Sequence, residues 1–91
     1  MNVNKDEVCI LIPTLNEALT IGEIIQDFRE LGYSHILVID GNSTDDTVKV
    51  AQKSGAEVLI QSGKGKGNAI IEAFEIIEQP YILMLDGDGT Y

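Results

Sequence analysis

A short apolar run near the start of the chain decides the fold, Val8-Cys9-Ile10-Leu11-Ile12-Pro13. Its length, its branched residues and the closing proline predict a buried strand. Apolar residues then recur at helical spacing, at Ile21, Ile24, Ile25, Phe28 and Leu31. A second β-branched run follows over Ile36–Ile39. This succession of strand, amphipathic helix and strand is typical of a parallel βαβ unit.

The same alternation continues along the rest of the sequence. Helical patterns are expected before Gly55 and over Ala69–Ile77, and strands over Glu57–Ile60 and Tyr81–Leu85. The order β-α-β-α-β-α-β predicts an α/β fold, a three-layer Rossmann-like arrangement with a parallel four-stranded sheet. Near-continuous apolar strands of this kind are covered by helices on both faces, and their crossovers are right-handed.

Capping residues predict where the first two helices begin and end. Possible capping boxes mark their starts, in the pairs Thr20 with Glu23 and Ser43 with Asp46. Glycines stand where C-terminal caps are expected, at Gly32 and Gly55.

Composition limits the classes of protein to consider. The 91 residues make one domain, and 44% are hydrophobic, enough for a core. The net charge of -9 argues against a nucleic-acid binder, which needs a basic face. No secretory pattern and no apolar stretch of about 20 residues are present, so we expect a cytoplasmic protein. The single cysteine, Cys9, excludes an internal disulfide and is expected to be buried.

Polar clusters follow all four predicted strands, at residues 13–17, 40–45, 61–67 and 86–91. Ligands of open α/β sheets bind at the carboxyl ends of the strands. Because the four clusters meet at that edge, the sequence predicts a ligand site there. The only histidine, His35, precedes the second strand and should lie at the opposite edge in a structural role.

Two of these clusters have a chemistry of their own. Asp86 and Asp88 are carboxylates two residues apart, suited to one Mg²⁺ or Mn²⁺, and the alternative is a simple Asp-Gly turn. The glycine-lysine loop Gly63–Gly67 precedes a helix, so it suits a phosphate, and the alternative is a solvated loop. Neither a Walker A loop nor a dinucleotide fingerprint is present.

The second cluster begins with Asp40, which ends a buried strand. A carboxylate there can accept hydrogen bonds from a base or a ribose. The residues that follow it, Ser43 and Thr44, have the alternative role of capping the next helix. The Asn16-Glu17 pair likewise has two interpretations, a ligand contact and the start of a helix.

Together these residues resemble the family 2 glycosyltransferases of the GT-A fold. Within that family the likeness is to the dolichyl-phosphate mannosyltransferases and glucosyltransferases. It rests on four segments in the family's order and spacing, residues 12–17, 38–47, 65–69 and 85–91.

The resemblance implies a role for each matching residue. Pro13, Leu15 and Glu17 would line the nucleotide pocket, and Asp40 would contact the base or ribose. Lys66 would lie near the nucleotide. Asp86 and Asp88 would bind Mg²⁺ or Mn²⁺ on the diphosphate of a GDP- or UDP-sugar, with Asp86 also part of the nucleotide-sugar site. The metal would neutralise the leaving nucleoside diphosphate. The implied acceptor is a polyprenyl phosphate, and the implied stereochemistry is inversion.

The sequence departs from the family pattern in two ways. Many relatives carry a second aspartate where this chain has Gly41, which would change the base contact. A family catalytic domain is also more than twice as long, so residues 1–91 correspond to its nucleotide-sugar-binding half. The acceptor site and the catalytic base are expected in the other half, and we expect this chain alone to be inactive. We further expect Tyr81–Leu85, normally an interior strand, to form an exposed edge and to pair with a second copy.

Two other functions fit part of the pattern. Residues 86–90, Asp-Gly-Asp-Gly-Thr, match the nucleophile motif of haloacid dehalogenase-like phosphatases, with Asp86 as nucleophile and Asp88 as acid/base. That motif normally opens its domain, and this reading leaves the other three clusters unexplained. The second alternative is a module that binds nucleotide and metal, or serves assembly, without catalysis.

Overall fold

The computed structural model describes residues 3–61 and 66–85, with side chains of the second stretch described from residue 70. Strands and helices alternate along the chain as the sequence predicts. After a 3-10 turn at Lys5–Glu7 they are β1 (Val8–Thr14), α1 (Ala18–Glu30), β2 (His35–Asp40), α2 (Thr47–Lys53), β3 (Glu57–Ile60), α3 (Lys66–Ile76) and β4 (Tyr81–Met84).

The strands form one parallel sheet in the order β3-β2-β1-β4. From β1 the chain moves outward through β2 to β3, and α3 then brings it back to β4 on the other side of β1. The direction of winding therefore changes between β1 and β4, and ligands of open α/β sheets bind at such a point. The register pairs Thr14 with Asp40, so β1 and β2 end side by side.

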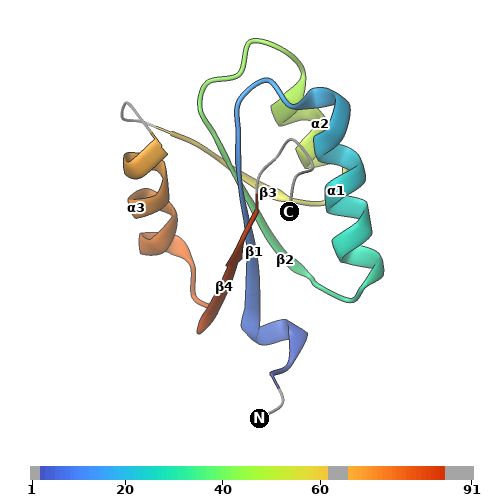
Figure 1. The fold of residues 1–91 in the computed structure, drawn as a ribbon, viewed down its shortest axis with the longest axis vertical. Helices are drawn as coiled ribbons and strands as arrows, with labels where there is room; N and C mark the ends of the chain where they lie inside the picture. Colours follow the sequence, from blue (N-terminus) through green and yellow to red (C-terminus); the bar gives the residue numbers. More distant parts are fainter. Residues whose placement is uncertain (1–2, 62–65, 86–91) are drawn as a thin grey trace.

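The helices cover the two faces of the sheet unequally. Figure 1 shows α1 and α2 on one face and α3 on the other. Alternate strand residues point to opposite faces and form two clusters. The α1/α2 side has Ile10, Ile12, Ile21, Ile24, Ile25, Phe28, Ile36, Val38, Ala51 and Leu85. The α3 side has Cys9, Leu11, Leu37, Ile39 and Ala73. The predicted three-layer α/β fold is confirmed.

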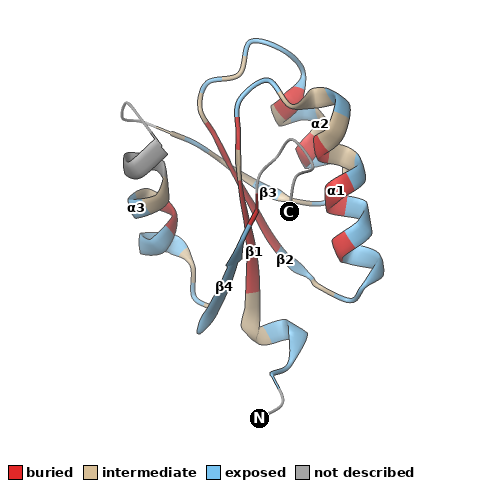
Figure 2. Cartoon of the chain, in the orientation of Figure 1, coloured by how far each residue is buried: buried red, intermediate tan, exposed pale blue. Residues whose placement is uncertain are grey.

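Burial is concentrated in the two central strands, as Figure 2 shows. In contrast, β4 lies at the edge of the sheet and its side chains are exposed on both faces. Tyr81, Ile82, Leu83 and Met84 are 40%, 40%, 42% and 48% exposed. The predicted exposed edge is therefore present at Tyr81–Met84, whereas Leu85, which the prediction included, follows the strand and is buried.

Both predicted capping boxes are wrong. The helix α1 begins at Ala18, so Thr20 lies inside its first turn, and α2 begins at Thr47 with Asp46 at the N-cap position. The side chain of Ser43 is engaged instead with Asp40 and with the backbone of Asn16. Ser43 therefore bonds its own loop and the loop after β1 instead of capping α2, and the Thr20 hydroxyl donates to the carbonyl of Glu17 at 3.5 Å.

The other predicted helix ends hold to different degrees. Gly32 and Gly55 follow α1 and α2 with φ of 101° and 103°, the left-handed conformation of a glycine cap, as predicted. The helix α3 begins at Lys66 rather than at Ala69. Glycine has a low helix propensity, and Gly67 is the reason that the sequence pattern predicts a loop up to this residue. No helix in the described part of the chain has the length and apolar character of a membrane span.

Candidate functional site

The loops that follow β1 and β2 lie together at the carboxyl edge of the sheet (Figure 1). The backbone N–H of Gly41 donates to the carbonyl of Thr14 at 2.9 Å. On the other side of β2, the N–H of Gln61 donates to the carbonyl of Asp40 at 2.8 Å. These bonds continue the ladder one residue past the strand ends. Backbone hydrogen bonds alone therefore hold the starts of these loops at the carboxyl edge, and side-chain bonds add to them.

Asp40 is the centre of the site and is completely buried. One carboxylate oxygen accepts bonds from the hydroxyls of Thr14, at 2.8 Å, and Ser43, at 2.5 Å. The other accepts the backbone N–H of Ser43 at 2.7 Å. Hydrogen bonds to a carboxylate are stronger than those between neutral groups, and burial makes them harder to give up. Asp40 thus fixes the loop after β2, and its contact with a base or ribose stays a prediction.

Asn16 connects the first loop to the second. Its backbone has φ of 56°, in the left-handed region. Its N–H donates to the hydroxyl of Ser43 at 2.9 Å. Its side-chain Oδ1 accepts the N–H of Thr44 at 2.8 Å, the hydroxyl of Thr44 at 3.3 Å and the N–H of Asp45 at 3.3 Å. One residue therefore makes four bonds to three consecutive residues of the other loop.

A second connection joins the beginnings of α1 and α2. The carboxylate of Asp45 accepts the N–H of Ala18 at 3.3 Å and the N–H of Thr47 at 2.9 Å. The Thr47 hydroxyl donates to the same carboxylate and accepts the N–H of Glu17 at 2.8 Å. The bond from the Thr47 hydroxyl lowers the pKa of Asp45 below its usual value. The ionised carboxylate is therefore the form that this connection favours.

The predicted site residues fall into two groups. Pro13, Leu15, Glu17 and Asp40 lie at the carboxyl edge: Pro13 is half-buried in β1, Leu15 is 58% exposed, and Glu17 is the half-buried N-cap residue of α1. Lys66 is the first residue of α3, and its side chain lies outside the described part. Asp86 and Asp88 lie outside the described residues. The predictions on Lys66, Asp86 and Asp88 remain predictions.

Gly41 leaves space between the ends of the first three strands. A Cβ at this position would lie 3.5 Å from the Thr14 carbonyl oxygen, 3.7 Å from Gln61 Oε1 and 3.8 Å from Leu15 Cδ1. These are ordinary van der Waals distances, so the backbone tolerates a side chain here. The side chains of Leu15 and Gln61 frame the space that Gly41 leaves.

Sequence reasoning missed the connecting role of Asp45 and Thr47. Thr47 is fully buried although it is polar and opens a helix. The sequence does contain a signal for this role: a threonine that begins a helix two residues after an aspartate. Which loop it bonds depends on the strand register, and the local sequence does not give that register.

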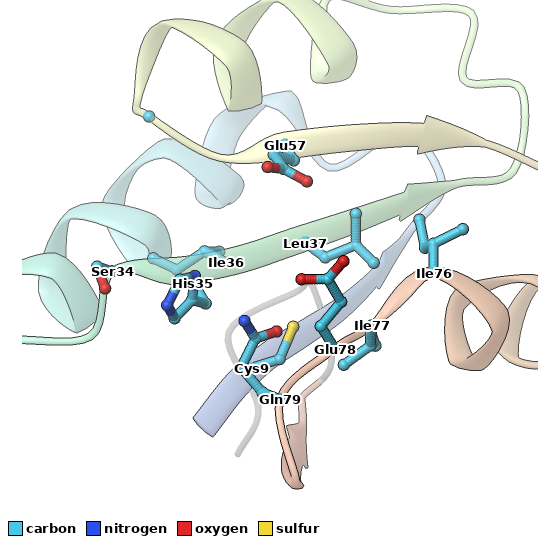
Figure 3. A pocket seen from close by; sticks show the side chains of 11 residues that line it. Cys9, Ser34, His35, Ile36, Leu37, Glu57, Ile76, Ile77, Glu78 and Gln79 are labelled. Carbon is cyan, nitrogen blue, oxygen red and sulfur yellow. The ribbon is translucent and has the colours of Figure 1, made fainter. Parts of the chain in front are cut away.

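A cavity of about 400 Å³ lies at the opposite edge of the sheet, at the amino ends of β1 and β2 (Figure 3). His35, Glu57, Glu78 and the buried Cys9 are among the residues that line it, and burial raises the pKa of the Cys9 thiol. His35 thus lies away from the polar loops, as predicted. Within residues 3–61 and 66–85, no three His, Cys, Asp or Glu residues are grouped so that they could hold a metal.

Comparison with known proteins gives related chains in one family. Glycosyltransferase AglJ of Haloferax volcanii is 59% identical over 87 residues, which cover 94% of this chain and 29% of the relative. The dolichyl-phosphate hexose transferase of the same organism is 32% identical, over 94% of this chain and 38% of the relative. The chain thus spans about a third of the length of these relatives.

A solved structure has the same fold. Glucosyl-3-phosphoglycerate synthase from Mycobacterium tuberculosis, in complex with UDP, superposes with a TM-score of 0.83 and 28% identity. The match covers 91% of this chain and 34% of the synthase. The synthase has also been crystallised with Mn²⁺, UDP-glucose and phosphoglyceric acid. The architecture is that of the GT-A glycosyltransferases, as expected. Residues 9–91 match Glycosyl transferase family 2 over almost the whole chain, and the chain belongs to that family.

Proposed function

We propose that the chain forms the nucleotide-sugar-binding part of an enzyme that transfers a sugar from a nucleoside diphosphate to an acceptor. The observation that carries the proposal is the pair of connected loops after β1 and β2, at the edge where this family-2 fold changes winding direction. Ligands of open α/β sheets bind there. The UDP complex of the related synthase supports a nucleotide as the ligand.

The base and ribose would lie over the ends of the first strands. Leu15 offers an exposed apolar side chain beside Gly41, and the base would pack against it. Pro13, near the end of β1, and Glu17, at the start of α1, lie two residues before and after Leu15, and Asp40 fixes the loop opposite. In this arrangement the buried Asp40 carboxylate holds Ser43 and so fixes the loop beside the nucleotide, and the Leu15 side chain contacts the base.

The diphosphate would lie toward β4 and the beginning of α3. The crossover from β3 to β4 places the N-terminus of α3, with Lys66, at the carboxyl edge, and helix N-termini attract phosphate. The N–H of Leu85 donates to the carbonyl of Leu11 at 2.9 Å, and Asp86 is the next residue in the sequence. Asp86 and Asp88 have the oxygen ligands that suit Mg²⁺ or Mn²⁺, and the bound metal would neutralise the leaving diphosphate. The Mn²⁺ complex of the synthase supports this assignment.

For the whole enzyme we propose a polyprenyl phosphate as acceptor. The dolichyl-phosphate hexose transferase among the relatives supports this choice. The alternative is a module that binds the nucleotide and metal without catalysis. An assay of sugar transfer to added polyprenyl phosphate by the whole enzyme distinguishes the two, because only the first produces a glycosylated lipid.

The donor site is tested by calorimetric titration of the chain with UDP and with GDP, each with and without Mn²⁺. We expect one nucleotide to bind more tightly when Mn²⁺ is present, because Asp86 and Asp88 would hold the metal and its charge would offset that of the diphosphate. Asp88→Ala should remove the effect of Mn²⁺. The matched control is Asp27→Ala, which removes an exposed aspartate from α1. If neither nucleotide binds, or if Asp88→Ala keeps the full Mn²⁺ effect, the proposed donor site is wrong.

We also propose that a second copy of the chain pairs with β4. The outer backbone edge of β4 has no strand beside it among the described residues, and its four side chains are 40–48% exposed. Such an edge pairs readily with an identical edge. Leu83→Lys should shift the chain toward the monomer in sedimentation measured over a concentration series. Leu19→Lys is the matched control, since Leu19 is 98% exposed on α1. A wild-type chain that is monomeric throughout the series would contradict the pairing.

A further inference from the structure

We infer that Asn16 is a positioning residue of this site: its side chain fixes the loop that carries Leu15 and Glu17 to the loop after β2. The inference rests on the proposed function and assigns a role within it. Leu15 and Glu17 flank Asn16 on either side, and Asn16 bonds Ser43, Thr44 and Asp45 opposite.

The backbone of Asn16 makes this connection possible. A φ of 56° is costly for most side chains, and asparagine, aspartate and glycine adopt it most readily. In this conformation the N–H and the side chain of Asn16 both reach the second loop. Glycine would keep the backbone conformation and lose only the side-chain bonds. Asparagine at this position is therefore explained by its amide oxygen and not by its backbone alone.

The bonds of Asn16 are exposed, unlike those of Asp40. When an exposed bond is removed, water replaces the lost partner, so the fold loses little stability. The loops nevertheless lose the contact that selects one relative arrangement. A ligand that needs both loops then binds only to the fraction of molecules that keep this arrangement, and its apparent affinity falls by that fraction. We therefore expect Asn16 to affect nucleotide affinity more than it affects the stability of the fold.

The chain contains a matched control at Asn42. This residue also has a left-handed backbone, with φ of 66°, and its side chain makes one long bond of 3.4 Å to the carbonyl of Gln61. Asn16→Gly and Asn42→Gly are thus the same substitution in the same backbone conformation. Only Asn16→Gly removes the bonds between the first two loops.

The experiment compares wild type, Asn16→Gly and Asn42→Gly by three measurements: the melting temperature, the amide hydrogen exchange of Thr44 and Asp45, and the affinity for UDP or GDP with Mn²⁺. For Asn16→Gly we expect a melting temperature within a few degrees of wild type and faster exchange of both amides. We expect its nucleotide affinity to fall about tenfold, which corresponds to one or two net hydrogen bonds. For Asn42→Gly we expect less than about a twofold change in affinity.

Each outcome decides the inference. Unchanged exchange in Asn16→Gly would show that its side chain does not hold the loops, and unchanged affinity would show that the connection does not position the ligand. Equal effects of the two glycine variants would assign the result to the backbone. If the wild-type chain binds neither nucleotide, the proposed function fails and with it the positioning of a nucleotide. The exchange data then still establish whether Asn16 connects the loops.

Discussion

Asp40→Ala is expected to destabilise the fold by about 4 kcal/mol, because three hydrogen bonds to a buried carboxylate are lost together. The substitution leaves the hydroxyls of Thr14 and Ser43 and the N–H of Ser43 without their acceptor. Each bond to a charged group contributes about 1.5–3 kcal/mol, and their effects overlap because they share one carboxylate. The total stability of a chain of this size is about 5–13 kcal/mol, so the loss is a large share of it.

The loss is measured by urea unfolding, as a lower midpoint at constant slope. If Asp40→Ala does not fold, Asp40→Asn supplies the measurement, because it keeps the shape and one acceptor oxygen. It places an amide group opposite one of the Ser43 donors, so an intermediate loss is expected. Asp46→Ala is the control, since the Asp46 side chain makes no capping bond, and its effect should stay below about 0.5 kcal/mol. A midpoint for Asp40→Ala equal to that of Asp46→Ala would show that the carboxylate does not hold the loop.

The same substitution should abolish nucleotide binding even in molecules that remain folded. The Ser43 hydroxyl that accepts the N–H of Asn16 also donates to Asp40, which orients it. Losing Asp40 therefore releases both loops, whereas losing the Asn16 side chain releases one connection between them. We expect the order of nucleotide affinity to be wild type, then Asn16→Gly, then Asp40→Ala.

The sheet and its helices could be predicted because their sequence signals are local. The apolar run at residues 8–13 and the helical spacing that follows it specify a strand and a helix without reference to the rest of the chain. Gly32 and Gly55 mark helix ends through their own backbone freedom. Polar clusters after each strand predict a candidate site at the carboxyl edge, because parallel strands end together, and the structure brings the first two clusters together there.

The failed predictions concern side chains that bond across the sequence. Ser43 looked like a helix cap, but its hydroxyl bonds Asp40 and the backbone of Asn16, 27 residues away. Asp40 was predicted to contact a base or ribose because it ends a strand; its carboxylate is buried and bonds the following loop, and the ligand contact stays a prediction. A strand-end carboxylate can do either, and the choice depends on Thr14 lying opposite in the register of β1 and β2.

The second large effect is expected for Ile25→Ala, in the core between α1 and the sheet. Ile25 is completely buried in the cluster that includes Ile10, Ile12 and Val38. Truncating a buried isoleucine to alanine costs about 2–5 kcal/mol, through lost burial and the cavity that remains. We expect about 3.5 kcal/mol here, because a chain of this length has few other buried side chains to close the gap.

Leu19→Ala is the matched control for Ile25→Ala, because Leu19 is on the same helix and 98% exposed. It should change the free energy of unfolding by less than about 0.5 kcal/mol. Equal midpoints for the two variants would contradict the packing of α1 on the sheet. Hydrogen exchange separates this core effect from that of Asp40: Ile25→Ala should raise exchange throughout the sheet by global unfolding, since it removes no bond of the loops. Asp40→Ala should in addition raise exchange at Ser43 beyond the global rate, because that N–H loses its own acceptor.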